Sequence, residues 1–206
     1  MTTVGEAIAK LEAIVLAAGA GSRFGGRKLT APWRDGVLLD GALTAAFAAP
    51  VRTVCVVTGA DPGVERAAVE FAEQREDGAR LRLVHAADFA TGMSASLKSG
   101  IAALPSDADG VFVFLGDMPR VPHAVPLLLA SSLKKGILAV APTFEGRRGH
   151  PVLFSRSLFA PLLAIEGDEG ARKVLSTLGA SLADVHCSDP GVLLDVDRPG
   201  DLSHAE

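Results

Sequence analysis

The sequence predicts an α/β fold in which a mostly parallel sheet is covered by helices on both faces. Short runs of apolar and β-branched residues, typical of buried strands, alternate with longer segments whose apolar residues recur at helical spacing. This alternation favours right-handed β-α-β units. The 206 residues suffice for one domain with a substantial core, and we expect a single domain over residues 1–206.

The first half of the chain contains four expected strands and the helices that connect them. Pro50 follows the end of the first helix and Pro62 opens the second, because proline fits a first helical turn but not a helix interior. A break at Glu76, Asp77 and Gly78 ends that second helix. The expected strands are residues 13–16, 53–58, 81–84 and 110–115. The first expected helix is 38–48, and the third is 94–104.

The last third of the chain has a more mixed pattern. A helix over about residues 122–135 and a strand over 137–141 continue the alternation. We then expect a short strand at 151–154, helices that begin near Ser155 and near Glu169, and one or two late strands at 182–186 and 192–194. This pattern predicts an antiparallel C-terminal addition to the same sheet and not a second domain.

Composition is typical of globular proteins and excludes several classes of function. Hydrophobic residues make up 49% and charged residues 21% of the chain, so disorder is not expected. A net charge of -4 argues against a nucleic acid or an anionic membrane as partner. Two cysteines are too few for a disulfide framework. The sequence shows neither a signal-peptide pattern nor a long apolar stretch, so we expect a cytoplasmic location.

A glycine-rich loop follows the first strand and is the most informative segment of the chain. It contains Gly19, Gly21 and Gly25, together with the cations Arg23 and Lys28. Backbone N–H groups approach a phosphate closely only where side chains are absent, and the two cations add full positive charge. The loop therefore predicts a protein that binds a nucleotide.

Further polar residues fall where other strands end, at the edge of an open α/β sheet that binds ligands. Thr58 ends the second strand. Gly92, Ser94 and Ser96 stand before and within an expected helix, where Ser94 either contacts a ligand or caps the helix. Asp117 directly follows an apolar strand, whose fixed backbone suits a metal ligand, and the alternative for this residue is a turn.

A pair of carboxylates near the C-terminal end of the chain is a second candidate for metal binding. Asp195 and Asp197 are two residues apart, so both side chains face the same side of an extended segment. One of them could join Asp117 on Mg²⁺, which takes a few carboxylates together with substrate phosphates and water. The alternative for this pair is a turn before Pro199.

Two later loops are candidates for contact with an anionic substrate. Arg147 and Arg148 lie between glycines and either hold an anion or form a solvated hairpin tip. His150 precedes a proline and is therefore extended, with either a structural hydrogen bond or an acid–base role. In the second loop Asp168 is expected to cap a helix, and Arg172 is a candidate anion contact.

Two common nucleotide-binding patterns are absent from the sequence. A dinucleotide-binding protein would show G-x-G-x-x-G and an acid at the end of the second strand, where this chain has Thr58 and Gly59. The P-loop pattern G-x-x-x-x-G-K-[ST] is absent as well. Two cations facing an acid that can hold Mg²⁺ suit nucleotidyl transfer, in which the α-phosphorus of a triphosphate is attacked in line and pyrophosphate leaves.

A resemblance to a known family rests on six ordered motifs, at residues 16–28, 91–97, 116–119, 149–152, 167–172 and 195–202. These motifs resemble the MobA-like nucleotidyltransferases and, within that family, the molybdenum cofactor cytidylyltransferase branch. Ala18 fits this branch, since guanylyltransferase relatives usually carry glycine there. Phe24, Arg27, Arg198 and Gly200 depart from the usual residues. The resemblance implies a Rossmann-like three-layer α/β/α fold of the nucleotide-diphospho-sugar transferase type.

The resemblance also implies roles for individual residues in binding a nucleoside triphosphate. The backbone of residues 16–18 would read the base, and the glycine loop with Arg23 would wrap the triphosphate. Lys28 would neutralise the charge that builds on the α-phosphate and on the leaving pyrophosphate, and with Arg23 and Asp117 it forms the expected catalytic set. The residues expected to bind the nucleotide are Leu16, Ala17, Ala18, Gly19, Gly21, Ser22, Arg23, Lys28, Thr58, Gly92, Ser94 and Ser96.

A metal site and an acceptor site are implied in the same way. Asp117 would hold Mg²⁺ with Asp197 or Asp195 as second carboxylate. A pterin-type acceptor would enter over Gly149, His150 and Arg172.

The sequence therefore leads to a main hypothesis and to alternatives that remain open. The main hypothesis is a Mg²⁺-dependent transfer of CMP from CTP to the molybdenum cofactor, with release of pyrophosphate. The same fold could instead use GTP or another phosphorylated acceptor. A non-catalytic chaperone that carries the cofactor to a client molybdenum hydroxylase and an NAD(P)-dependent reductase are the alternatives from other functional classes.

Overall fold

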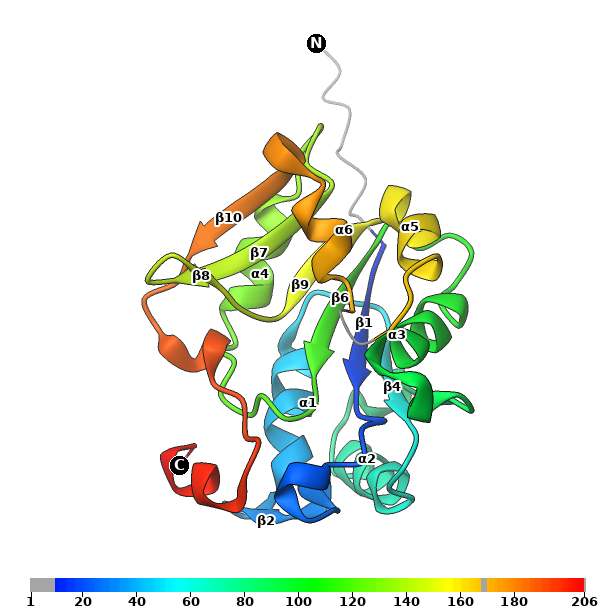
Figure 1. Cartoon of the computed structure of the whole chain (residues 1–206), viewed down its shortest axis with the longest axis vertical. Coiled ribbons are helices and arrows are strands. Elements are labelled where there is room, and N and C mark those ends of the chain that lie inside the picture. Colours follow the sequence, from blue (N-terminus) through cyan, green and yellow to red (C-terminus); the bar gives the residue numbers. More distant parts are fainter. Residues whose placement is uncertain (1–9, 168–169, 206) are drawn as a thin grey trace.

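The computed structural model describes residues 10–167 and 170–205 of the chain, and its centre is one large sheet (Figure 1). The strands follow one another across the sheet in the order β10-β7-β9-β6-β1-β4-β5, and β8 pairs with β7. A separate two-stranded ribbon consists of β2 (Pro32–Trp33) and β3 (Gly36–Val37). The strands of the large sheet are β1 (Leu11–Leu16), β4 (Val54–Thr58), β5 (Leu81–His85), β6 (Gly110–Leu115), β7 (Ala139–Phe144), β8 (Arg147–Arg148), β9 (Val152–Ser155) and β10 (Leu182–His186).

The sheet is mostly parallel, as the sequence predicts. One direction is shared by β1, β4, β5, β6, β7 and β10. Within this set β1 pairs in parallel with β4 and β6, β4 with β5, and β7 with β10. The antiparallel strand along this path is β9, which lies between β6 and β7. The antiparallel element is therefore inserted into the sheet, while the last strand, β10, adds to its edge in parallel.

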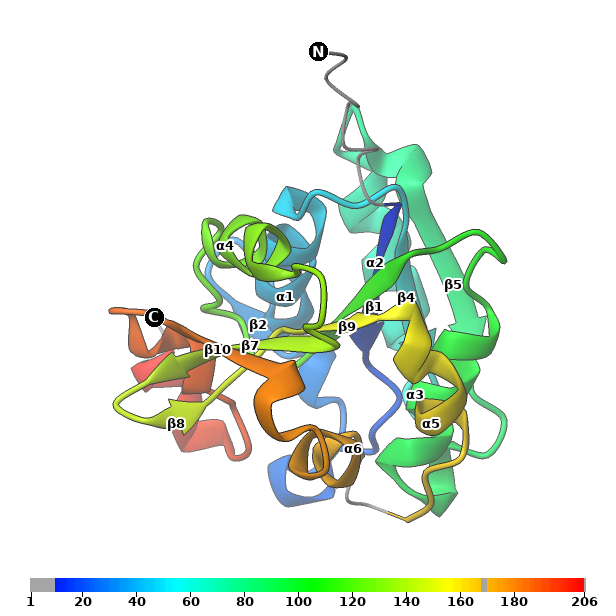
Figure 2. The same cartoon turned by 90° about the horizontal axis from the view of Figure 1, so that it is seen from above.

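Helices cover both faces of the sheet (Figure 2). Helices α1, α2 and α4 pack on one face, and α3, α5 and α6 on the other. Among the described residues, no helix combines the length and the apolar character needed to cross a membrane. The helices are α1 (Leu38–Ala48), α2 (Gly63–Glu73), α3 (Met93–Ala102), α4 (Val125–Ser132), α5 (Phe159–Leu163) and α6 (Arg172–Ser176).

The central strand β1 separates two hydrophobic cores. Successive side chains of a strand point to opposite faces, so Ala13 and Val15 join the core under α1 and α2, while Ile14 joins the core under α3. All three side chains are fully buried. Full burial of a large aliphatic side chain such as Ile14 stabilises the fold by roughly 2 kcal/mol, so these two cores hold the carboxyl end of β1 in a fixed position.

The segment after β10 differs from the sequence-based expectation. The predicted strand at residues 192–194 is wrong, because Pro190–Leu193 form a 3-10 turn. The carboxylate of Asp189 accepts the N–H of Gly191 at 2.7 Å and so starts the turn. The carbonyl of Val192 then accepts the N–H of His150 at 2.8 Å. This contact carries the C-terminal segment past the ends of the central strands.

Candidate active site

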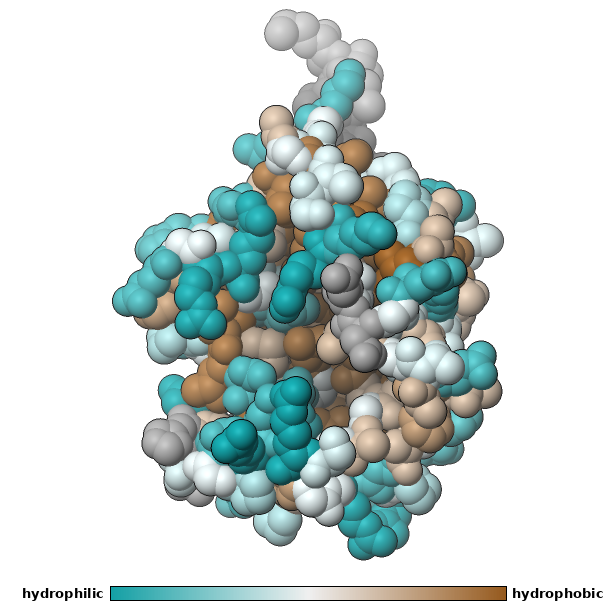
Figure 3. Space-filling model, in the orientation of Figure 1, coloured by the Kyte–Doolittle hydropathy of each residue, from teal (hydrophilic) through white to brown (hydrophobic). Residues whose placement is uncertain are grey.

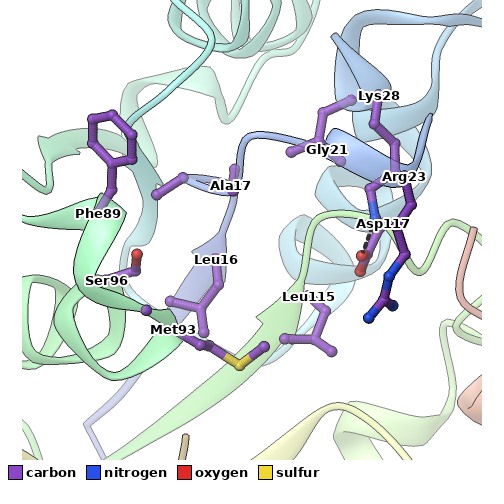
Figure 4. A pocket seen from close by; sticks show the side chains of 14 residues that line it. Leu16, Ala17, Gly21, Arg23, Lys28, Phe89, Met93, Ser96, Leu115 and Asp117 are labelled. Atoms are coloured by element: carbon purple, nitrogen blue, oxygen red, sulfur yellow. Dashed lines mark hydrogen bonds and ion pairs between the residues drawn. The ribbon is translucent and has the colours of Figure 1, made fainter. Parts of the chain in front are cut away.

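A cavity of about 470 Å³ opens at the carboxyl ends of β1 and β6, the edge at which open α/β sheets bind ligands. Its wall combines the end of β1, the glycine loop, the start of α3, the last residue of β6 and Asp117 two residues further on (Figure 4). This face of the molecule is hollowed, with hydrophobic residues in its depth and hydrophilic residues along its border (Figure 3). The predicted nucleotide-binding residues that line the cavity are Leu16, Ala17, Ala18, Gly19, Gly21, Arg23, Lys28, Gly92 and Ser96.

The glycine loop folds back so that Lys28 lies beside the end of β1. Gly21 and Gly25 flank the 3-10 turn Ser22–Phe24 with left-handed φ angles of 59° and 93°, which glycine adopts without steric cost. The N–H of Gly26 donates to the carbonyl of Gly21 at 3.0 Å. A Cβ atom on Gly21 would lie 2.9 Å from Cβ of Lys28. The missing side chain therefore lets the loop close on the lysine.

Lys28 is the centre of a cluster of opposite charges at one end of the cavity. Its Nζ lies 2.6 Å from Oδ2 of Asp117 and 3.5 Å from Oδ1 of Asp197. Arg23 donates to Oδ2 of Asp197 at 3.0 Å. The Lys28 side chain is only 13% exposed, so water screens its charge less than it screens a surface ammonium. A ligand that carries several phosphates would meet two cations here.

Backbone hydrogen bonds hold the C-terminal segment against Asp117. The N–H of Val196 donates to the Asp117 carbonyl at 3.0 Å. The carboxylate of Asp201 accepts the N–H of Asp197 at 3.0 Å and that of Arg198 at 2.7 Å. Asp117 and Asp197, which lie far apart in the sequence, are thus brought to the same ammonium group.

The carboxylates of this cluster repel one another. The pKa of Asp195 is raised above its ordinary value, first by loss of surrounding water and then by the charge of Asp117, and Asp197 adds to this effect while Lys28 opposes it. Negative charge in this region therefore exceeds what the lysine compensates. A divalent cation would relieve that excess.

The donor set fits a magnesium ion that substrate would help to hold. Within residues 10–167 and 170–205, no group of three or more His, Cys, Asp or Glu side chains is arranged to hold a metal by itself. The oxygens of Asp117 and Asp197 that face Lys28 are hard donors, which Mg²⁺ prefers. Since Mg²⁺ is commonly bound through one or two carboxylates plus substrate phosphates, two such ligands suffice.

A second cavity, of about 540 Å³, adjoins the first. Leu16, Met93 and Leu115 line both cavities, so a ligand in one would lie next to a ligand in the other. The three residues predicted to contact the acceptor also line this second cavity, namely Gly149, His150 and Arg172.

His150 is the buried titratable group of the second cavity. Burial lowers the pKa of its imidazole below the ordinary value, the backbone carbonyl of Val113 and the charge of Asp117 oppose this effect, and Arg172 adds to it. Nδ1 of His150 lies 3.5 Å from the Val113 carbonyl oxygen. A lowered pKa keeps the ring neutral at neutral pH, so His150 offers the acceptor a neutral polar edge.

The rim of the second cavity carries exposed charges. Arg147 and Arg148 form the short strand β8, and Arg148 makes a forked ion pair with Asp184 at 2.7 and 3.1 Å. Arg148, which lines the cavity together with Arg172, is thus engaged with an acid of this chain. The predicted helix cap Asp168 lies outside the described residues, and the helix expected near Glu169 is α6, which begins at Arg172.

Three predicted nucleotide-binding residues do not line the first cavity. The hydroxyl of Ser94 donates to the carbonyl of Gly167, so this serine ties α3 to the second loop. Thr58 is buried, with its hydroxyl 3.5 Å from Nδ1 of His85. Ser22 lies exposed in the 3-10 turn of the glycine loop. The first two hydroxyls therefore make contacts within the protein.

Sequence reasoning missed four hydrophobic residues that line the first cavity: Leu29, Phe89, Met93 and Leu115. Leu29 and Leu115 stand next to predicted polar residues and form the apolar wall between them. Met93 directly follows the Thr91–Gly92 dipeptide, and this position was a signal that could have identified it. Phe89 lies outside that motif.

Comparisons with known proteins find relatives along most of the chain. The family model described as the MobA-like NTP transferase domain matches residues 13–184. The molybdenum cofactor cytidylyltransferase of Escherichia coli (strain K12) is 26% identical over 95% of this chain and 95% of its own length. The purine catabolism protein PucB of Bacillus subtilis (strain 168) is 29% identical over 90% of this chain and 91% of its own.

Solved structures share the same fold. The crystal structure of Rv0371c from Mycobacterium tuberculosis H37Rv superposes with a TM-score of 0.78 at 26% identity, and covers 96% of this chain and 97% of that one. A complex of Rv0371c with manganese superposes with a TM-score of 0.73 at 24% identity over 96% and 98% of the two chains. The similarity extends over nearly the whole chain.

Proposed function

The chain belongs to the MobA-like NTP transferase family and is a nucleotidyltransferase, and we propose that it transfers CMP from CTP to molybdopterin in the presence of Mg²⁺. The observation that carries this proposal is the pair of joined cavities. One cavity ends in the Lys28 cluster beside the glycine loop, and the other is lined by His150 and Arg172. The name of the Escherichia coli relative supports CTP and the molybdenum cofactor as substrates.

In this proposal the first cavity holds the triphosphate against the glycine loop. Backbone N–H groups around Gly19 and Gly21 approach the phosphates, and Arg23 and Lys28 neutralise them. Both cations then exchange their carboxylate partners for phosphate oxygens. The N–H of Ala17 is already bonded to the carbonyl of Val57 at 2.9 Å, so the base edge would be read by other polar groups of residues 16–18.

The acceptor binds in the second cavity with its phosphate directed at the shared wall. An oxygen of that phosphate attacks the α-phosphorus of CTP, a new P–O bond forms, and the bond from the α-phosphorus to the bridging oxygen of pyrophosphate breaks. The bonding electrons leave with pyrophosphate. Lys28 stabilises the charge that grows on the leaving oxygens, and the remaining catalysis comes from positioning two anions in line.

Asp117 and Asp197 would hold Mg²⁺, which when bound supplies positive charge to the phosphates and supports their orientation. The manganese complex of Rv0371c supports a divalent cation in this fold. Asp195, with its raised pKa, is the more distant candidate, because no ion pair joins it to Lys28 among the described residues.

The test is a nucleotide-turnover profile with purified cofactor as acceptor. Molybdopterin, Mg²⁺ and one of CTP, GTP, ATP or UTP are incubated with the protein, and released pyrophosphate is measured. We expect release with CTP that requires both the acceptor and the cation. If GTP is the one nucleotide that supports pyrophosphate release, the proposed activity is that of a guanylyltransferase. Release with a different phosphorylated acceptor would overturn the molybdopterin assignment.

A second candidate is supported by the other relative, whose name states purine catabolism and not nucleotidyl transfer. In that candidate the chain holds the molybdenum cofactor and delivers it to a client molybdenum hydroxylase. Tight cofactor binding with no pyrophosphate release for any of the four nucleotides would favour it over the first proposal.

A further inference from the structure

We propose that Phe89 forms the nucleobase wall of the first cavity, where its ring stacks on the base and sets nucleotide affinity without choosing between bases. This inference rests on the proposed nucleotidyl transfer, since it assumes that a nucleoside triphosphate occupies the cavity. Neither the sequence motifs nor the names of the relatives point to this residue.

The position of Phe89 matches the end of the cavity that a base would occupy. Phe89 and Lys28 lie on opposite sides of the cavity, and Asp117 stands on the lysine side (Figure 4). If the phosphates lie at Lys28, the base of the same nucleotide lies at the far end. Ser96 lies on the same side as Phe89 (Figure 4). The small side chains of Ala17 and Ala18 also line the cavity and leave room for a flat ring.

The ring of Phe89 is held in place by its neighbours. The edge of His85 meets it with a centroid distance of 6.3 Å and an interplanar angle of 72°, a favourable aromatic arrangement. Gly59 packs against the base of the Phe89 side chain, because a Cβ atom on Gly59 would lie 2.9 Å from Cβ of Phe89 and 2.7 Å from the carbonyl oxygen of Ala18. A ring that is already fixed loses little conformational freedom when a base stacks on it.

Stacking explains affinity but not base selection. Every base has a π-face, so an aromatic wall binds cytosine, guanine and adenine alike, and removal of one such contact weakens binding by about 10- to 100-fold. Base selection needs hydrogen bonds to the polar edge, which Phe89 cannot supply. The two properties are therefore assigned to different parts of the same cavity.

The experiment compares nucleotides with a ligand that lacks a base. For Phe89→Ala we expect the KM for the nucleotide that the wild type uses to rise about 10- to 100-fold while kcat stays within about threefold. Inhibition by inorganic tripolyphosphate should be unchanged within about twofold, because this ligand reaches only the lysine end. Phe89→Tyr should restore the KM. In Lys28→Met, inhibition by tripolyphosphate should weaken instead.

Two further measurements keep the inference separate from the function on which it rests. Phe89→Leu preserves most of the apolar volume without a π-face, so it folds like the wild type and should still raise the KM. An unchanged KM in both Phe89→Ala and Phe89→Leu overturns the inference. A loss of tripolyphosphate inhibition in these variants that parallels the rise in KM overturns it as well. If calorimetry finds no nucleotide binding to the wild type, the proposed function itself fails.

Discussion

Two clusters of charged side chains lie at opposite ends of the central strands, and they are built from the same kinds of residue. At the amino end, Glu12 of β1 is fully buried. Its carboxylate accepts the Nε–H of Arg52 at 2.7 Å, and the N–H and hydroxyl of Thr53 at 2.9 and 2.6 Å. Asp107 pairs with the other side of Arg52, whose guanidinium, together with Lys10, holds the pKa of that aspartate well below its ordinary value.

The cluster at the carboxyl end is less complete and open to the cavity. Lys28 has two carboxylate partners, while Asp195 nearby has a raised pKa caused by lost water and by the neighbouring acids. At the amino end, the charge of the buried acid Glu12 is compensated within the protein. At the carboxyl end, the negative charge of the acids exceeds the positive charge that compensates it. Burial alone therefore does not identify a functional charge. Incomplete compensation next to a cavity is the better indicator.

The largest predicted effect concerns the open cluster. Replacing Lys28 by Met should lower pyrophosphate release by roughly 10²- to 10³-fold, since a preorganised charge at the developing anion is lost. The thermal midpoint should change by only a few degrees, because the acids that lose this partner are partly exposed to water. Steady-state turnover and thermal melting measure the two quantities.

The matched control for this variant is Lys134→Met, an exposed lysine just before β7, at the opposite edge of the sheet. It should leave turnover and melting unchanged. Wild-type turnover in the Lys28 variant would show that the open cluster has no catalytic role.

The closed cluster should show the reverse behaviour. Replacing Glu12 by Ala should lower the free energy of unfolding by about 2–4 kcal/mol, because the N–H and hydroxyl of the half-buried Thr53 lose their acceptor and the guanidinium of Arg52 loses one of its two carboxylate partners. The kcat of the folded variant should stay within about twofold of wild type, since Glu12 lies at the other end of β1 from the cavity. Urea unfolding and turnover of the folded protein check both statements.

Glu70→Ala is the control for the closed cluster. Glu70 pairs with Arg66 across one helical turn at 3.7 Å, and its side chain is 61% exposed. Such a surface pair contributes less than about 1 kcal/mol. Equal destabilisation in the two variants would contradict the contrast between a buried and an exposed acid.

Most of the fold follows from the sequence, for a physical reason. Runs such as residues 110–115 are buried on both faces, so their composition alone predicts a strand in a covered parallel sheet. The turn at Pro190–Leu193 was mistaken for a strand because its buried Val192 and flanking leucines resemble a short apolar run. What decides that segment is the cap from Asp189, a local hydrogen bond that composition does not reveal.

The site was predictable where chemistry is carried by charge and less so where it is carried by shape. Lys28 and Asp117 could be proposed together because the glycine loop that carries Lys28 follows β1 and Asp117 follows the end of β6. The carboxylate that joins Asp117 could not be chosen between Asp195 and Asp197, since that choice depends on how the segment before Pro199 is held. Phe89 was missed because an aromatic residue in a loop has no distinguishing pattern until the cavity is seen.

His150, at the carboxyl end of the central strands, allows a test of how stability depends on pH. Its pKa lies below 6.5 in the folded protein because of burial. As the pH falls through this ordinary value, the unfolded chain binds a proton that the folded chain refuses, so stability is lost on the acid side. Between about pH 7.5 and about pH 5.5 this loss amounts to at most about 1.4 kcal/mol.

His150→Gln removes that contribution, so the variant should lose less stability than the wild type over the same interval, as measured by urea unfolding at both pH values. The exposed His123→Gln serves as control and should follow the wild type. An identical pH dependence for His150→Gln and wild type would mean that the buried imidazole accepts its proton as freely as in the unfolded chain.

The smallest expected effect concerns Thr58, which ends β4 beside the cavity without lining it. Its hydroxyl faces Nδ1 of His85 at 3.5 Å, a distance at which a hydrogen bond contributes little. Thr58→Val preserves the buried shape and should change the KM for the nucleotide less than twofold, and the free energy of unfolding by less than about 1 kcal/mol. A tenfold rise in KM would place the hydroxyl on the nucleotide after all. A residue at the end of a strand would then belong to the first cavity even though its own polar atom is buried. The contrast between compensated and uncompensated groups would have to include neutral side chains.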